Sequence, residues 1–213
     1  MSASAAAERN DKELAVLNAA IRVFLAHGFG AATTDMIQRE AGVSKATMYA
    51  CFPNKEALFE AVIRRETANM EAAIRAIPVV PDDIGGMLIG IGVSYLKGIL
   101  SPERAALFRA IVAEAPRLPH LGHLFYRAGP QTITRVVAAQ LTEAARRGEI
   151  DLHATGAEEA ASLFINMARG EGLMEYLTHP ESVPSAARME HWARQAVAVF
   201  LAAFGRVQET EDR

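Results

Sequence analysis

The sequence predicts an all-α protein of about nine helices, and three observations support this fold class. Apolar residues recur three and four positions apart, as they do in the stripe Leu14, Leu17, Ile21 and Phe24. Glycine and proline mark clear helix ends, for example at residues 101–102, 147–148 and 179–180. No run alternates apolar and polar residues for long enough to form a convincing strand.

The stretch over residues 33–59 has the features of two short helices joined by a tight turn, followed by the start of a third helix. Thr33 is a good N-cap for the first helix, and Gly42 stands where that helix must stop. Ser44 then caps a second helix over residues 45–51, which ends before a proline. Two short helices joined in this way form a helix-turn-helix, whose second helix fits the major groove of DNA.

The rest of the chain is predicted as further helices around this motif. A helix over residues 10–27 completes a three-helix head, which we predict as a DNA-binding domain of residues 1–53. A long helix without glycine or proline, residues 54–77, connects it to a larger helical domain of residues 54–213. Further helices are expected over residues 82–100, 102–115, 118–147 with a break at residues 129–130, 157–178 and 185–205. The ends, residues 1–9 and 208–213, are expected to lack regular structure.

Residues 33–59 resemble the DNA-binding signature of the TetR (tetracycline repressor) family of bacterial transcriptional regulators. The residues that match this signature in register are Thr33, Thr34, Ile37, Ala41, Gly42, Val43, Ser44, Thr47, Tyr49, Phe52, Lys55, Leu58 and Phe59. Two positions depart from it, because Ala46 stands where many relatives have glycine and Cys51 stands where many have histidine. The resemblance implies a DNA-binding transcriptional regulator.

The resemblance also divides the candidate DNA contacts into two groups. The residues that match phosphate-contacting positions are Thr33, Thr34, Tyr49 and Lys55. The residues that open the second helix and are expected to face the groove are Ser44, Lys45, Ala46 and Thr47. Lys45 can donate to guanine O6 or N7, and the methyl groups of Ala46 and Thr47 can meet a thymine methyl. The structural alternative is that Ser44 and Thr47 only cap the helix and that Tyr49 only packs.

Dimerisation follows from the size of the motif, since one head reads only a few base pairs and two symmetric heads read a palindrome. The last two predicted helices are candidates for a four-helix interface across a twofold axis. The small and aromatic residues that suit such an interface are Ala160, Ala161, Ala168, Ala196, Ala198, Ala202, Trp192, Phe200 and Phe204. The alternative is that the alanines face the core of the monomer, and both hold if they lie on different faces.

Residues 107–173 resemble the C-terminal domain of the AefR-like branch of the TetR family, which implies homodimeric ligand sensing. Candidate residues for lining a pocket that binds a small apolar effector are Met70, Tyr95, Phe108, Ile111, Phe125, Tyr126, Phe164, Met167 and Met174. Methionine and aromatic residues at helical spacing are more often plain core, which is the structural alternative. A charged side chain such as Arg109 or Glu114 could orient a ligand, unless both are solvated.

The composition limits the class of protein. The 213 residues are 51% hydrophobic with a formal net charge of −3, which fits a globular protein and excludes a broadly basic nucleic-acid binder. Residues 1–55 contain six Lys/Arg against five Asp/Glu, a net charge of +1, so that the remainder carries −4. Any DNA affinity must therefore come from a few placed contacts and from dimerisation.

The compartment is predicted from cysteine content and apolar runs. One cysteine rules out an internal disulfide and suits a reducing compartment, and no signal peptide is visible, so we expect a cytoplasmic protein. The strongest membrane candidate, residues 84–100, is interrupted by Lys97 and has too short an apolar run, which favours a buried helix.

Three features could suggest other chemistry, and each has a simpler interpretation. His120 and His123 lack a cysteine or carboxylate at ligand spacing, which favours surface histidines over a metal site. The glycines at residues 85–92 lack the preceding strand and the Gly-Lys-Ser/Thr ending of a phosphate loop. Cys51 has no second cysteine to resolve an oxidised form, which favours a packing role. We predict no metal, no cofactor and no catalytic constellation of nucleophile and base.

These patterns predict a homodimeric TetR-like regulator, a repressor that leaves its palindromic double-stranded operator when a small apolar effector binds. The helix over residues 54–77 would transmit a change in the spacing of the two heads. The main alternative is a DNA-binding architectural or activator protein of the same fold that needs no ligand. An enzyme and a plain protein-interaction module are the other classes considered.

Overall fold

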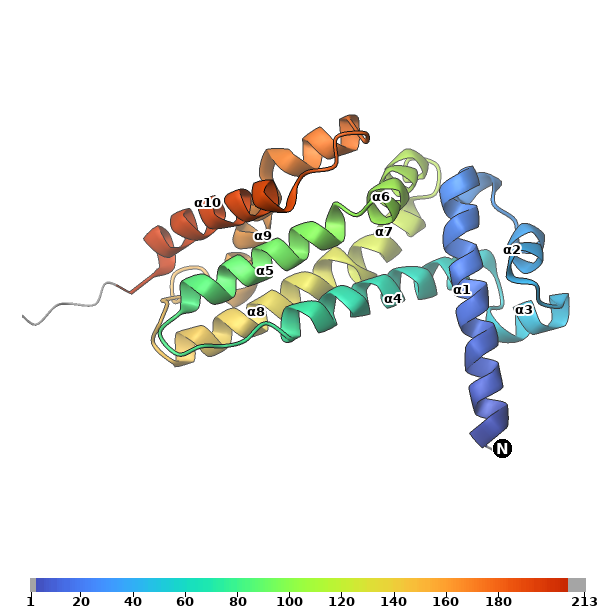
Figure 1. Cartoon of the computed structure of the whole chain (residues 1–213), viewed down its shortest axis with the longest axis horizontal. Coiled ribbons are helices and arrows are strands. Elements are labelled where there is room, and N and C mark those ends of the chain that lie inside the picture. Colours follow the sequence, from blue (N-terminus) through green and yellow to red (C-terminus); the bar gives the residue numbers. More distant parts are fainter. Residues whose placement is uncertain (1–2, 207–213) are drawn as a thin grey trace, which may run out of the picture. The chain divides into compact units, whose positions relative to one another are not determined.

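The computed structural model describes residues 3–206, and this part of the chain is all α-helical (Figure 1). Its only β-type pairing within those residues is an isolated bridge between Ile150 and Gly205. The helices are α1 (Ala3–Ala31), α2 (Thr34–Ala41), α3 (Lys45–Cys51), α4 (Lys55–Arg75), α5 (Ile84–Ile99), α6 (Pro102–Glu114), α7 (Pro119–Ala128), α8 (Pro130–Arg146), α9 (Ala157–Thr178) and α10 (Ala186–Phe204). The predicted fold class is confirmed, and so is the helix break at residues 129–130, where Gly129 separates α7 from α8.

The first helix is longer than the sequence patterns suggested. The expectation that residues 1–9 lack regular structure was wrong for residues 3–9, because α1 begins at Ala3. Four of the residues 3–7 are alanine, which has the highest intrinsic helix propensity and extends the helix towards the N-terminus. At its other end α1 continues to Ala31 across a kink at Gly28. Residues 1–2 and 207–213, including the predicted frayed end, lie outside the described residues.

The described chain forms two compact units, and the first comprises residues 3–68 and 103–130. It contains α1–α3, most of α4, α6 and α7. In its core the rings of Phe24 and Phe29 on α1 surround Phe59 on α4, with centroid separations of 5.7 and 5.2 Å in edge-to-face geometry. Such aromatic pairs add to the free energy of simple burial. This ring cluster therefore joins α4 to the helix that supports the helix-turn-helix.

The buried side of α1 differs in one respect from the predicted stripe. Leu17 and Phe24 are buried, as predicted, but Leu14 is 43% exposed. Val16 and Val23 are buried in the same cluster. The buried face of α1 is therefore rotated about the helix axis relative to the predicted stripe. The segment Ala7–Ala31 of this helix is the one helix among the described residues that is long and apolar enough to cross a membrane. A helix buried in a protein core passes the same test.

The second unit comprises residues 69–102 and 131–206 and is built from α5, α8, α9, α10 and the end of α4. Helix α10 packs against both α5 and α9. Phe164 of α9 meets Phe200 of α10 edge to face with a centroid separation of 5.5 Å, and Phe200 stacks on Phe204 at 4.6 Å. The predicted membrane candidate corresponds to α5, whose residues Leu88 and Leu96 are fully buried in this core.

These units follow packing and not chain order. Helices α6 and α7 belong to the same unit as the three-helix head, and α4 contributes residues to both units. The predicted division at residues 53 and 54 places α6 and α7 with the C-terminal part, and as a division into functional domains it stays a prediction.

Candidate nucleic-acid interface

The turn between α2 and α3 is fixed by capping interactions that the sequence predicted. Thr33 Oγ1 accepts a hydrogen bond from the first turn of α2 at 3.2 Å. Gly42 ends α2 with φ 66° and ψ 27°, a left-handed conformation that costs glycine little because it has no Cβ. The next residue, Val43, donates its N–H to Gln38 C=O at 3.3 Å, and Gln38 Nε2 donates to Val43 C=O at 3.0 Å. These two hydrogen bonds between Gln38 and Val43 stabilise the turn between α2 and α3.

Helix α3 presents its first residues to solvent. Ser44 Oγ accepts the N–H of Thr47 at 3.1 Å and lies 2.8 Å from Thr47 Oγ1, so Ser44 caps α3, and its contact with the groove stays a prediction. On the inner side Met48 is fully buried in the core of the unit. Ser44, Lys45 and Ala46 are exposed. A helix anchored on one side and exposed at its N-terminal residues has the geometry that reading a major groove requires.

Three predicted phosphate contacts lie beside this helix, and two of them are hydrogen-bonded to each other. Thr34 Oγ1 and Tyr49 OH are 3.1 Å apart and connect the start of α2 to α3. Tyr49 is 43% exposed, so that this hydrogen bond orients its side chain at the surface of the protein. Thr33 is exposed at the N-cap of α2. Hydroxyl groups at helix starts are suited to phosphate oxygens, and these contacts stay predictions.

Lys45 has a partner that sequence reasoning had considered only as a helix-dipole residue. Lys45 Nζ lies 3.1 Å from Asp35 Oδ1, and both side chains are more than half exposed. The hydrogen bond and charge of Asp35 raise the pKa of the Lys45 ammonium. Asp35 precedes Lys45 by ten residues across the turn, a spacing that gives no local signal of contact. The ammonium predicted to read a base is therefore paired with a carboxylate in the described chain, at an exposed position where such a pair contributes little to stability.

Lys55, the remaining predicted phosphate contact, is half-buried and directed at the protein backbone. Its Nζ donates to the carbonyl oxygens of Phe29, Gly30 and Ala32 at 2.7, 3.3 and 2.9 Å. Burial lowers the pKa of the Lys55 ammonium, against the attraction of Glu56 and Glu114. The phosphate contact stays a prediction, but the three donors of this ammonium already have acceptors within the chain.

A second pair of cations lies next to α3. Arg9 and Lys12 of α1 line a hollow of about 380 Å³ together with Thr47, Ala50 and Cys51 of α3. The Lys12 ammonium is paired with Glu8 at 2.6 Å. Arg9 and Lys12 are three residues apart and so share a helix face, which is the signal that sequence reasoning could have used once α1 was extended to its observed start. Cys51 is half-buried beside them.

The predicted effector-lining residues divide between the two units. In the second unit Met70, Tyr95 and Phe164 are buried in the core and Met167 packs against it. In the first unit Ile111 is buried, and the rings of Phe108 and Phe125 are 5.7 Å apart. Tyr126 and Met174 are 59% and 65% exposed, so within the single chain they do not line an enclosed space, because their side chains point to solvent. The set as a whole stays a prediction.

Polar groups lie among these apolar residues in each of the two units. Burial raises the pKa of the Tyr95 phenol, and the nearby Arg169 guanidinium opposes this shift. In α6 the half-buried Arg109 has an Nη1 that is shielded from solvent and lacks a hydrogen-bond partner among the described residues. Glu114 is half-buried and lies against Gly30, so that it is not simply solvated.

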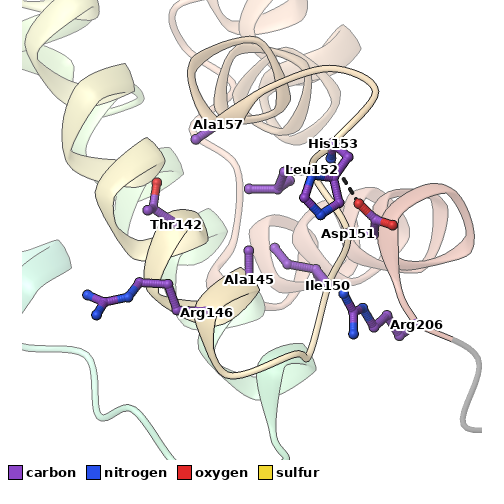
Figure 2. Close-up of a pocket in the computed structure, with 9 residues that line it drawn as sticks. All are labelled: Thr142, Ala145, Arg146, Ile150, Asp151, Leu152, His153, Ala157 and Arg206. Atoms are coloured by element: carbon purple, nitrogen blue, oxygen red, sulfur yellow. Dashed lines mark hydrogen bonds between the residues drawn. The ribbon is translucent and has the colours of Figure 1, made fainter.

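The second unit also contains a hollow that sequence reasoning missed. It has a volume of about 340 Å³, and its lining residues are Thr142, Ala145, Arg146, Ile150, Asp151, Leu152, His153, Ala157 and Arg206. Figure 2 shows that the guanidinium of Arg146 points away from the other lining residues. The backbone N–H of His153 donates to Asp151 at 2.8 Å, which shapes the loop between α8 and α9. None of the predicted effector residues lines this hollow.

The small residues predicted for a dimer interface fall on two faces. Ala160, Ala161, Ala168 and Ala196 are at most 4% exposed and face the core of their own chain, as the alternative interpretation held. Phe200 is fully buried as well, while Trp192 and Phe204 are half-buried. Ala198 and Ala202 of α10 are exposed, and their neighbour Val199 is 59% exposed. These three residues leave a small apolar face of α10 uncovered.

The histidines considered as metal ligands lie on the surface of α7. His120 and His123 are both exposed. Within residues 3–206 no group of three or more His, Cys, Asp or Glu side chains is arranged to hold a metal ion. The exposure of both side chains agrees with the interpretation of this pair as surface residues.

Two family descriptions match the chain, one over the helix-turn-helix head and one over the C-terminal part of the chain. Residues 16–62 match "Bacterial regulatory proteins, tetR family", and residues 86–206, more than half the chain, match "AefR-like transcriptional repressor, C-terminal domain". The chain belongs to the TetR family. It is therefore a helix-turn-helix, DNA-binding transcriptional regulator, in a family without enzymatic activity, and its C-terminal domain is AefR-like, as the resemblances implied.

Relatives of this TetR-family regulator are similar over most of the chain. It is 30% identical to the HTH-type transcriptional regulator UidR of Escherichia coli strain K12 over 63% of this chain and 67% of UidR. A TetR-family regulator from Mesorhizobium loti MAFF303099 is 25% identical with a TM-score of 0.81, covering 97% of this chain and all of that one. The flavonoid-responsive regulator FrrA is 32% identical with a TM-score of 0.76, covering 91% of this chain and 97% of FrrA.

Proposed function

We propose that this TetR-family regulator is a cytoplasmic repressor that binds a palindromic operator as a homodimer and leaves it when a small, mainly apolar effector binds. The observation that carries the proposal is the helix α3, anchored by Met48 and exposed at Ser44, Lys45 and Ala46. A repressor is favoured over an activator because the larger matched region is described by a repressor domain.

The DNA contacts that we propose combine a reading group with a positioning group. Lys45, Ala46 and Thr47 would meet base edges, and Ser44 would cap α3 at the same time. The hydroxyls of Thr33, Thr34 and Tyr49 would contact phosphates on either side. The net charge of −3 is consistent with a protein that relies on a few such contacts made twice by a dimer.

The dimer that we propose forms through the outer faces of α9 and α10. Leu163 of α9 is 49% exposed and Val199 of α10 is 59% exposed. The exposed Ala198 and Ala202 have short side chains, so that little stands out from this face of α10. Small residues let two backbones approach closely, while apolar side chains at the edges gain free energy on burial. A twofold axis through this face would create a four-helix interface from α9 and α10 of each chain.

The effector class that we propose is a flat, mainly apolar molecule with at least one oxygen acceptor. Buried Tyr95 and Phe164 and the adjacent Met167 supply apolar and aromatic contacts in the second unit. The phenol of Tyr95 in the same core can donate a hydrogen bond to an oxygen of the effector. FrrA is described as flavonoid-responsive, so plant-type polyphenols are a first panel to test here.

The release mechanism that we propose is a shift between two populations of head spacing. Helix α4 is continuous and contributes residues to both compact units, so it is the element that can carry a change from the second unit to the head. The effector must bind the non-operator spacing more tightly than the operator spacing, because equal affinity for both would shift nothing.

The proposal is tested with a duplex that the wild-type protein selects from a random-sequence pool. We expect the selected sequence to be palindromic, and we expect a promoter carrying it to be transcribed less when the protein is added. A polyphenol panel is then screened for compounds that weaken binding to this duplex. Increased transcription on addition of the protein would contradict the repressor assignment, and the absence of any selected duplex would contradict operator binding.

Replacement of Lys45 by alanine should relax the preference at one base position of the selected duplex. If the ammonium donates to guanine O6 and N7, the discrimination lost is about 1–3 kcal/mol. The measurement is competition between the selected duplex and its single-base variants. Lys97→Ala is the control, because Lys97 is exposed on α5 in the other unit and should leave base preference unchanged. Unchanged preference in the Lys45 variant would count against its base-reading role.

A further inference from the structure

The C-terminal turn of α1 is closed by a side chain from another helix. The last carbonyl groups of a helix have no partner within that helix and must be satisfied elsewhere. At this end of α1 the carbonyls of Phe29, Gly30 and Ala32 all accept hydrogen bonds from the ammonium of Lys55, the first residue of α4. Lys55 joins two helices that are far apart in the sequence, at the point where the chain enters the helix-turn-helix.

The surroundings of Lys55 reinforce this arrangement. Its Nζ lies 4.4 Å from the centre of the Phe29 ring, a cation–π contact. The carboxylate of Glu114, at the end of α6, lies so close to Gly30 that a Cβ there would collide with it. Glu114 also attracts the Lys55 ammonium. A cation and an anion from two other helices therefore flank the same turn of α1.

We propose that Lys55 is a positioning residue for the helix-turn-helix, which fixes the end of α1 against the start of α4 and does not neutralise a DNA phosphate. Ala32, the last of its three acceptors, directly precedes Thr33, the N-cap of α2. Fixing the Ala32 carbonyl therefore fixes where α2 begins relative to α4. An ammonium has three N–H donors, and all three are engaged within the chain.

This inference rests on the proposed operator binding, and salt dependence separates the two possible roles of Lys55. Affinity for DNA decreases with salt concentration, and a plot of log affinity against log salt becomes shallower by about 0.9 for each phosphate contact removed. A dimer that loses the contact in both subunits would therefore have a slope smaller in magnitude by about 1.8. In the full-length Lys55→Met variant we expect a lower unfolding temperature, about tenfold weaker binding to the selected duplex, and the wild-type slope. Lys55→Gln, which keeps amide donors but no charge, should recover part of the affinity.

The matched control is Lys97→Met, the same substitution at an exposed position of α5, which should change neither the unfolding temperature nor the slope. A reduced slope in Lys55→Met with an unchanged unfolding temperature would overturn the inference in favour of the phosphate contact. Equal affinities of the glutamine and methionine variants would also overturn it. If the wild-type protein selects no duplex, operator binding fails, and an unchanged unfolding temperature in Lys55→Met still overturns the positioning role by itself.

Discussion

Ala198→Arg should convert the dimer into a monomer and weaken binding to the selected duplex by about a hundredfold or more, because two linked half-sites bind far more tightly than one. Ala198 is exposed on α10 next to Val199 and Ala202, so an arginine side chain would stand where the proposed partner helix must approach closely. It would also bury a charge without an arranged partner, which is strongly unfavourable.

The monomer itself should fold normally, since Ala198 is exposed and surface substitutions usually change stability by about 0.5 kcal/mol or less. Sedimentation velocity gives the oligomeric state, and circular dichroism gives the fold. Ala73→Arg is the matched control, because Ala73 is an exposed alanine on α4, away from the proposed interface helices. A variant that remains dimeric with wild-type operator affinity would show that α10 is not the interface.

The parts of this molecule that sequence reasoning predicted well are those decided by local chemistry. Thr33, Gly42 and Ser44 act through hydrogen bonds and backbone angles within a few residues of themselves. Their roles as helix caps and helix stop can therefore be predicted from their residue types alone. The break at Gly129-Pro130 is local for the same reason, since proline cannot continue the preceding helix.

The parts that sequence reasoning could not reach depend on contacts between distant residues. Ala160 and Ala198 are the same residue type on neighbouring helices, yet one is fully buried and the other exposed, because the packing of α5, α9 and α10 decides which side is covered. Lys55 matched a phosphate-contacting position by sequence, but its acceptors lie more than twenty residues earlier. The spacing of apolar residues along the chain cannot predict a contact between a side chain and a backbone so far apart in the sequence.

The start of α1 was missed for a different reason. Compositional arguments treat a short run of small and polar residues as unstructured, while alanine within that run continues an existing helix at little cost. The extension has a consequence for the candidate site, because it places Arg9 beside α3. The role of the N-terminal residues could be considered only after the observed start of α1 was known.

Phe59→Ala should cost about 3–5 kcal/mol of unfolding free energy, a large fraction of the stability of a typical domain. Phe59 is fully buried and lies edge to face with both Phe24 and Phe29, so that the substitution removes two ring contacts and leaves a cavity. Denaturant unfolding measures the loss. Tyr126→Ala is the matched control, because Tyr126 lies in the same unit but is 59% exposed, and it should cost about 0.5 kcal/mol or less.

The effect on DNA binding follows from where the ring cluster lies. Phe59 is on α4 and its two partners are on α1, beside the turn that Lys55 closes, so the cavity would loosen the support of α2 and α3. Operator affinity should therefore fall together with stability in Phe59→Ala, whereas in Ala198→Arg affinity falls while the fold is kept. A loss below about 1 kcal/mol would mean that the cavity collapses without strain, and the head would not depend on this cluster.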